Sequence, residues 1–238
     1  MKRSLLRSLI PVYIFIIALL IITAFWGNRA ITSFHENKTI NSGRTVIIDA
    51  GHGGVDGGAT SCSGVLESNL NLKIALRLND LMHLLGISTV MIRTEDISVY
   101  TDGNTIAAKK ISDLKYRVKT VNSIPDGILI SIHQNYFSDG RYSGSQVFYG
   151  NNNESRYLAE HVQKALATAI DKENKRKIKK ADGIYLMDKI KCTGILVECG
   201  FLSNPVEDKK LQDPEYQKKL CAVISSVTSQ YIQKDPIA

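Results

Sequence analysis

The stretch TVIIDAGHGG, residues 45–54, decides the fold class, because it joins a strand to a glycine-rich loop. Its first half is β-branched and apolar, which predicts a short buried strand over Thr45–Asp49, and the glycines end that strand. Downstream, apolar side chains recur at helical spacing from Leu70 to Leu85, and Gly86 ends the helix that this spacing predicts. A strand, a loop and then a helix form the first unit of an α/β domain.

The remaining chain repeats this alternation of strand-like and helix-like segments. Further strands are expected at residues 88–93, 127–132, 145–149 and 194–197, and further helices at residues 114–121, 155–170 and 216–231. The connection Tyr100–Ile111 has weak patterning, and we interpret it as a surface insertion. Residues 44–234 are expected to form a single α/β domain, with a twisted, mostly parallel sheet of about six strands and helices on both faces.

The N-terminus differs in composition from the rest of the chain. Three basic residues within the first seven positions precede a nearly unbroken apolar run, Leu9–Trp26, which is long enough to cross a bilayer. Residues 1–28 are expected to be either a membrane anchor or a cleaved signal peptide, and residues 29–43 a linker to the domain. Both alternatives place the domain outside the cytoplasm, either secreted or membrane-anchored.

The net charge excludes one broad class of partner. The chain has 30 basic and 23 acidic side chains, and residues 1–30 hold four of the basic ones, so the exported part carries 26 − 23 = +3. This charge is too small to indicate nucleic-acid binding. The densest basic run is Lys172–Lys180, which we interpret as a solvated surface loop. Contact with an anionic polymer or a membrane face is the alternative.

The cysteines do not indicate a structural metal cluster. The chain contains Cys62, Cys192, Cys199 and Cys221, and none of them forms a CxxC pair. A domain of this size does not need disulfides, so Cys199 and Cys221 are expected to be free buried thiols. Cys62 lies between His52 and Glu67, which are candidate metal ligands, but we do not expect Cys62 itself to bind a metal ion.

Three side chains that can bind a metal or transfer a proton lie at the ends of predicted strands. His52 follows the first strand, His133 follows the strand at residues 127–132, and Glu198 ends the last one. Ligands of open α/β sheets bind outside the carboxyl ends of the strands. These three side chains are therefore expected to lie together at one edge of the sheet.

Glu67 is expected to join them through helix geometry. It stands three and seven positions before Leu70 and Ile74, so it continues their buried stripe. A buried carboxylate is costly without a partner, and a bound cation would remove that cost. The alternative is a carboxylate near a helix start that is stabilised by the helix dipole, and Glu67 alone does not decide between the two.

Two imidazoles and one carboxylate, with an open coordination position, form the ligand set of catalytic zinc. Such an ion polarises a carbonyl and lowers the pKa of bound water to about 7. A second carboxylate must then accept the water's proton and pass it to the leaving nitrogen, and Glu198 is the candidate. The glycine-rich loop has neither a GxGxxG register nor a GK[ST] sequence, which argues against a nucleotide site. His35, His83 and His161 are interpreted as structural.

These segments resemble the zinc-dependent N-acetylmuramoyl-L-alanine amidases of the AmiC/LytC type. The matching residues run in family order: Val46–Ala59, Glu67, Arg93–Thr94, Leu114, Arg117, Asn122, Ile130–Asn135 and Leu196–Pro205. The resemblance implies that His52, Glu67 and His133 bind Zn²⁺ and that Glu198 is the catalytic acid and base. It also implies the reaction, which is hydrolysis of the amide between the muramic-acid lactyl group and the first L-alanine of the stem peptide.

The compact layout and the strand GSQVFY, residues 144–149, resemble the germination-specific spore-cortex branch, whose cut leads to muramic-δ-lactam. The expected partners are the substrate peptidoglycan and, through the N-terminal segment, the membrane. No wall-binding repeat or autoinhibitory insertion is apparent in the sequence, so targeting and control are expected to come from an activating protein or from the anchor. Two other functions remain open. One is a zinc peptidase that acts on stem peptides, and the other is a catalytically silent homologue that binds peptidoglycan.

Overall fold

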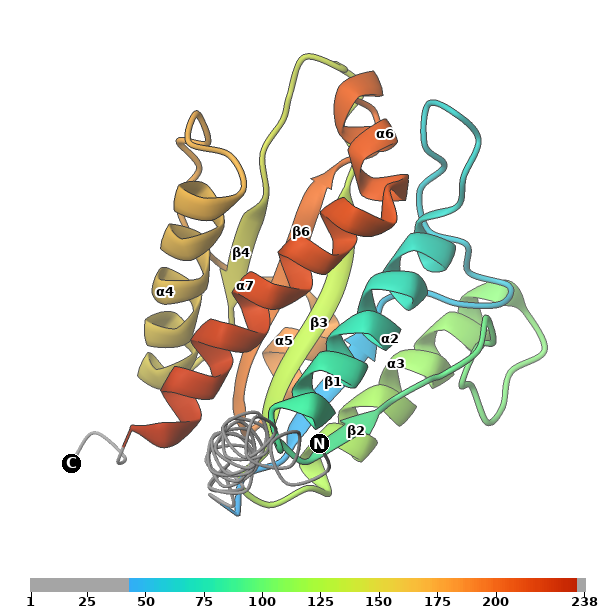
Figure 1. The fold of residues 1–238 in the computed structure, drawn as a ribbon. Helices are drawn as coiled ribbons and strands as arrows, with labels where there is room; N and C mark the ends of the chain where they lie inside the picture. Colours follow the sequence, from blue (N-terminus) through green and yellow to red (C-terminus); the bar gives the residue numbers. More distant parts are fainter. Residues whose placement is uncertain (1–42, 235–238) are drawn as a thin grey trace, which may run out of the picture. The chain divides into compact units, whose positions relative to one another are not determined.

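The computed structural model describes residues 43–234, which form an α/β domain on one six-stranded sheet (Figure 1). The strands are β1 (Val46–Ala50), β2 (Thr89–Met91), β3 (Ile128–Asn135), β4 (Gln146–Tyr149), β5 (Lys179–Lys180) and β6 (Thr193–Phe201). They lie in the order β2-β1-β3-β6-β4-β5, and every neighbouring pair is parallel except β4 with β6. The predicted α/β class and mostly parallel sheet are confirmed. The predicted anchor or signal, residues 1–28, lies outside the described residues.

Helices cover both faces of the sheet, as the sequence predicts. They are α2 (Glu67–Leu84), α3 (Ile106–Asn122), α4 (Asn153–Ala169), α5 (Tyr185–Lys189), α6 (Pro205–Gln212) and α7 (Pro214–Gln233). Helices α2, α4 and α7 lie on one face, and α3 and α5 lie on the other (Figure 1). Across residues 43–234, no helix combines the length and apolar character needed to span a membrane.

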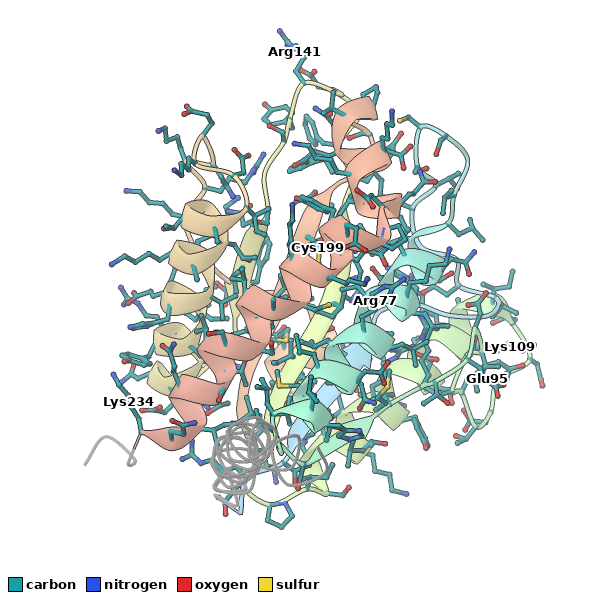
Figure 2. All side chains as sticks on the ribbon, viewed as in Figure 1. Arg77, Glu95, Lys109, Arg141, Cys199 and Lys234 are labelled. Atoms are coloured by element: carbon teal, nitrogen blue, oxygen red, sulfur yellow. The ribbon has the colours of Figure 1, made fainter. Side chains whose placement is uncertain are left out.

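Helix α3 begins earlier than the sequence predicts, at Ile106 instead of residue 114. The Thr105 hydroxyl accepts a hydrogen bond from the Ala108 amide at 3.2 Å and so caps the first turn. The segment Tyr100–Ile111, expected as a surface insertion, is therefore helical in its second half. Its first turns are largely exposed, with Ile106 at 74% and Ile111 at 54%, so they lack the apolar periodicity that predicts a helix; Lys109, at the edge of the domain in Figure 2, lies over the ring of Tyr100.

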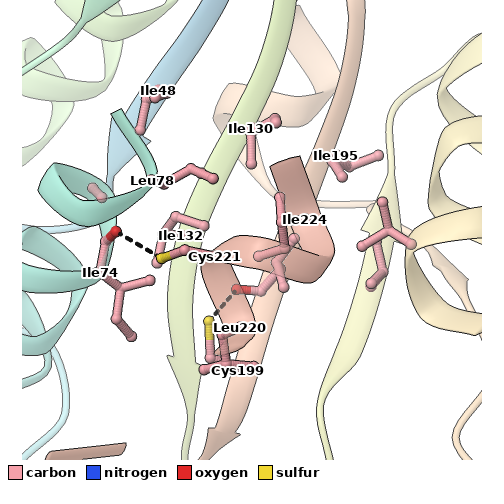
Figure 3. Packing of buried hydrophobic residues seen from close by; sticks show 14 of the residues in the cluster. Ile48, Ile74, Leu78, Ile130, Ile132, Ile195, Cys199, Leu220, Cys221 and Ile224 are labelled. Carbon is pink, nitrogen blue, oxygen red and sulfur yellow. Dashed lines mark hydrogen bonds between the residues drawn. The ribbon is translucent and has the colours of Figure 1, made fainter. Parts of the chain in front are cut away.

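Alternating side chains of the central strands enter two separate cores. Ile48 and Ile130 face α2 and α7, whereas their neighbours Ile47 and Leu129 face α3 and α5. Figure 3 shows the larger core, in which side chains of α2 and α7 pack over β3 and β6. A sheet that is covered on both faces explains why β1 and β3 read as nearly continuous apolar runs.

The two core cysteines are free thiols, as expected. Cys221 donates to the Ile74 carbonyl at 3.4 Å, and Cys199 donates to the Val197 carbonyl at 3.8 Å (Figure 3). Burial raises the pKa of the Cys221 thiol to about 12, and it raises the pKa of Cys199 above its ordinary range as well. Both thiols are therefore protonated at neutral pH and act as small packing residues.

A buried ion pair fixes the end of β1. Arg117 of α3 contacts the Asp49 carboxylate through Nη1, and its Nη2 donates to the His52 carbonyl at 2.7 Å. Ser131 of β3 donates to the same carboxylate at 2.6 Å. Burial by itself would raise the pKa of Asp49, but the Arg117 charge and the Ser131 hydrogen bond outweigh it and lower the pKa. The ionised pair thus ties α3 to the loop that follows β1.

Arg117→Met should reduce the free energy of unfolding by about 3–5 kcal/mol, because it leaves the Asp49 carboxylate buried without its counter-charge. Denaturant titration measures this loss. Arg141→Met is the matched control, since Arg141 pairs with Asp139 on the loop between β3 and β4 and its side chain is 91% exposed (Figure 2). The control should change stability little. Equal losses of unfolding free energy in the two variants would show that the ion pair between Arg117 and Asp49 does not stabilise the end of β1.

Candidate active site

His133 and Glu198 lie opposite each other in adjacent strands. They are Cα partners in the parallel ladder of β3 and β6, and their neighbours along each strand enter the larger core. Alternation therefore places both side chains on the face of the sheet that α3 and α5 cover. The sequence predicted strands that end at about these residues, but β3 continues to Asn135 and β6 continues to Phe201. The backbone pairing between β3 and β6 continues to Asn135 and Phe201, beyond the end of both apolar runs.

His52 lies in the loop after β1 with a left-handed backbone conformation, φ = 61°. For a residue other than glycine this conformation costs on the order of 1–3 kcal/mol, and the bond from Arg117 to its carbonyl helps to hold it. On the ring, Nδ1 is 3.0 Å from the Asp56 carboxylate and Nε2 is 3.3 Å from that of Glu67. Burial alone would lower the pKa of His52, but the two carboxylates raise it to about 9.

Glu67 joins the two histidines. It is the first residue of α2 and is 4% exposed, in agreement with the stripe that predicted its burial. Its Oε1 is 3.1 Å from His133 Nδ1, and its Oε2 is 3.3 Å from His52 Nε2. The amides of Ala59 and Gln134 donate to the carboxylate at 3.0 and 3.2 Å. Burial by itself would raise the pKa of Glu67, but the two imidazoles hold it well below its usual range.

The side chains of His52, Glu67 and His133 could hold a metal ion. One donor atom from each residue lies within 4.8 Å of the others. The backbone makes room for them at two glycines: a β-carbon on Gly51 would lie 2.2 Å from the His133 ring, and one on Gly58 would lie 2.7 Å from Glu67 Oε2. Two imidazoles and one carboxylate match the donor set of catalytic zinc, so the residues fit that ion.

Glu198 provides an unpartnered carboxyl group beside this cluster. Its Oε2 is buried and has no hydrogen-bond partner among residues 43–234. Burial raises the pKa of Glu198 to about 7; the positive charge of His133 opposes this rise, and the negative charge of Glu67 adds to it. A carboxyl group that exchanges its proton near neutral pH suits general acid and base chemistry. The structure thus brings together all four residues that the sequence singled out.

Asp56 also belongs to this site, although the sequence analysis did not single it out. Its carboxylate is 3.0 Å from His52 Nδ1 and 3.2 Å from Lys110 Nζ of α3. The hydrogen bond to His52 lowers the pKa of Asp56 most, and burial opposes this shift. A carboxylate that accepts the second ring N–H of a ligating histidine fixes the orientation of the ring. The only sequence signal was an acidic residue four positions after His52, which by itself indicates no partner.

Asp56→Ala should weaken zinc affinity by about 10–100-fold, because the imidazole of His52 loses the group that orients it. Competition with a chromogenic chelator measures the affinity. Asp182→Ala is the control, since Asp182 forms an exposed ion pair with Lys180 and should not affect the metal. If Asp56→Ala bound zinc as tightly as the unaltered protein, Asp56 would have no part in orienting His52.

The other histidines and Cys62 are placed elsewhere. The Cys62 thiol donates to the Asp208 carboxylate of α6 at 3.2 Å, which ties the loop before α2 to α6. His83 lies within 2.6 Å of the Thr89 hydroxyl at the far end of α2. His35 lies outside the described residues.

Comparisons with known proteins point to one group of enzymes. A family model described as N-acetylmuramoyl-L-alanine amidase matches residues 46–228. The germination-specific N-acetylmuramoyl-L-alanine amidase of Bacillus subtilis is 37% identical over 185 residues, and the match covers 77% of each chain. The N-acetylmuramoyl-L-alanine amidase LytC of the same species is 31% identical, with 79% of this chain and 36% of LytC covered. The CwlD amidase from Clostridioides difficile, solved in complex with the GerS lipoprotein, has 36% identity and a TM-score of 0.77, with 80% of this chain and 99% of that chain covered.

Proposed function

The chain belongs to the N-acetylmuramoyl-L-alanine amidase family, and on this premise we propose that it hydrolyses peptidoglycan with a zinc ion. An enzyme of this family acts on the cell wall and therefore outside the cytoplasm. The bond that we propose it cuts joins the lactyl group of N-acetylmuramic acid to the first L-alanine of the stem peptide. The proposed zinc ligands are His52, Glu67 and His133. Glu198 is the proposed catalytic carboxylate.

One observation supports this division of roles most directly. A cluster of three metal donors lies beside a buried carboxyl group that has no hydrogen-bond partner among residues 43–234. Zinc held by such a cluster supplies Lewis acidity for a carbonyl and lowers the pKa of water to about 7. Glu198 is the Cα partner of His133 across the β3–β6 ladder and is not a member of the three-donor group, which supports a role for it beside the proposed ligands.

Glu198 moves one proton during the reaction. The oxygen of water forms a bond to the lactyl carbonyl carbon, and the bond from that carbon to the alanine nitrogen breaks. Glu198 accepts a proton from the water and delivers it to the departing nitrogen, which needs a carboxyl group able to do both near neutral pH. The products are a lactyl carboxylic acid, which then loses its proton to the solvent and becomes the carboxylate, and a stem peptide with a free amino group.

A role in spore-cortex maturation is the finer proposal. It is supported by the 37% identity with the germination-specific amidase of Bacillus subtilis over 77% of both chains. The reaction leaves the free lactyl carboxylate that muramic-δ-lactam formation requires. We therefore propose that the wall that this enzyme modifies is the spore cortex.

We also propose that the enzyme works with a protein partner. The similar CwlD amidase from Clostridioides difficile was solved in complex with the GerS lipoprotein, which supports this expectation. Attachment to the membrane through residues 1–28 stays a prediction, because those residues lie outside the described part of the chain.

Mass spectrometry of peptidoglycan digested with the purified protein tests the proposed function. Digestion should yield glycan with free lactyl carboxylates and intact stem peptides, it should stop after chelation, and it should return with added zinc. Shortened stem peptides on intact muramic acid would instead indicate a zinc peptidase. A zinc-loaded protein that leaves every muropeptide uncut would indicate a silent homologue.

A further inference from the structure

A line of polar residues extends from Glu198 away from the metal ligands. Strand β6 lies between β3 and β4, so His133 is on one side of Glu198 and β4 is on the other. Gln146 of β4 is the direct antiparallel partner of Glu198. Residues opposite each other in such a pair share a face, with β-carbons roughly 4.5–5.5 Å apart. Gln146 is therefore the next side chain beyond the catalytic carboxyl group, and it is buried.

Gln146 holds Arg176 at this position. Its side-chain oxygen accepts from Arg176 Nη1 at 3.3 Å, and its side-chain nitrogen donates to the Lys177 carbonyl at 2.7 Å. Arg176 Nε donates to the Ser143 carbonyl at 2.7 Å. The guanidinium also lies over the ring of Phe201, 4.4 Å from its centroid. Contacts from residues 143–146 and from β6 thus hold the guanidinium in one orientation.

The fixed guanidinium keeps donors that the protein does not use. An arginine has five N–H donors, and two of those of Arg176 are bound to Ser143 and Gln146. Within residues 43–234, Arg176 forms no ion pair with a carboxylate, whereas Arg141 and Arg156 each do. A planar fork of donors matches a carboxylate in a bidentate arrangement. The remaining donors of Arg176 therefore suit an external carboxylate.

We propose that Arg176 binds a carboxylate of the stem peptide, an inference that rests on the proposed amidase function. Glu198 delivers a proton to the departing alanine nitrogen, so the peptide leaves the reaction centre on the side of Glu198. Arg176 lies farther in that direction, beyond Gln146. An extended peptide advances about 3.3–3.6 Å per residue, so the residues after the first alanine pass this position. The residues after the first alanine carry the free carboxylates of the substrate. Arg176, which belongs to the basic run Lys172–Lys180, thereby becomes part of the proposed substrate site.

Two synthetic N-acetylmuramoyl peptides test this subsite. They differ only at the acidic residue after L-alanine, which carries a free carboxylate in one and a carboxamide in the other. The unaltered protein should hydrolyse the carboxylate form with a kcat/KM about 10–100-fold higher, as expected for a charge-assisted hydrogen bond. Arg176→Met should abolish this preference by raising KM for the carboxylate form alone. Lys175→Met removes the same charge from the neighbouring exposed position and should retain the preference.

Arg176→Lys is the second variant, because it keeps the charge but loses the planar fork, and it should show an intermediate preference. Unfolding temperatures of all variants are measured beside the kinetics. Equal hydrolysis of the two substrates by the unaltered protein would overturn the subsite. The subsite would also be overturned if Arg176→Met or Arg176→Lys lowered kcat/KM for both substrates by the same factor. Hydrolysis of neither substrate by the unaltered protein would overturn the proposed function itself, and the subsite with it.

Discussion

Replacing Glu198 with glutamine is expected to leave the protein folded and zinc-loaded while it lowers kcat by about 10²–10⁴-fold. Glutamine keeps the size of the side chain, so β6 should pack unchanged against β3 and β4. The variant loses the oxygen that accepts the proton of water and passes it to the alanine nitrogen. This loss corresponds to roughly 3–5 kcal/mol of activation free energy. Hydrolysis of an N-acetylmuramoyl peptide, zinc content and unfolding temperature are measured on one preparation.

Glu160→Gln is the matched control for this change. Glu160 lies on α4, pairs with Arg156 on the surface and belongs to no part of the proposed site, so its amide should leave kcat unchanged. Near-normal hydrolysis by Glu198→Gln would show that Glu198 does not transfer the proton. Recovery of its activity on addition of zinc alone would make Glu198 a ligand.

His133→Ala is expected to remove most of the bound zinc, and activity with it. The substitution takes away one of three donors that the structure places within 4.8 Å of one another. Its effect on affinity should be at least the 10–100-fold typical of groups that only orient a ligand. Elemental analysis after dialysis against metal-free buffer measures it. Glu67→Gln should fail in a different way, with weaker binding that excess zinc partly restores.

His161→Ala serves as the control for the loss of a histidine. His161 lies on α4, where its ring is tilted by 35° against the ring of Tyr157 with centroids 4.1 Å apart, and it is not part of the group of three metal donors. This variant should keep the full zinc content. An unchanged zinc content in His133→Ala would remove His133 from the site.

Local patterns were sufficient for the parts of the molecule that bury a regular apolar face. The apolar run of β1 and the stripe of α2 predict both elements, and the same stripe predicts that Glu67 is buried. Because strand ends meet at one edge of a parallel sheet, sequence order also predicts that His52, His133 and Glu198 lie together. These inferences needed only periodicity and one general property of α/β sheets.

Features that depend on contacts between distant segments could not be predicted in this way. The exposed start of α3 lacks an apolar stripe, although its Lys110 contacts Asp56 behind His52. The pairing of Gln146 with Glu198 depends on β4 running antiparallel to β6, which no local pattern indicates. The contacts of Arg176 with Ser143, Gln146 and Phe201 join segments that are distant in sequence, so in the sequence Arg176 reads as one more residue of a basic surface run.

The central claim is that His52, Glu67 and His133 hold a zinc ion beside Glu198. Anomalous X-ray scattering at the zinc absorption edge, from crystals of the purified protein grown with zinc, tests it most directly. We predict one peak about 2.0–2.2 Å from a nitrogen of each histidine and from an oxygen of Glu67, with the Glu198 carboxyl group outside the coordination shell. A zinc peak on other residues, no peak at this cluster, or Glu198 in place of one of the three ligands would contradict the claim.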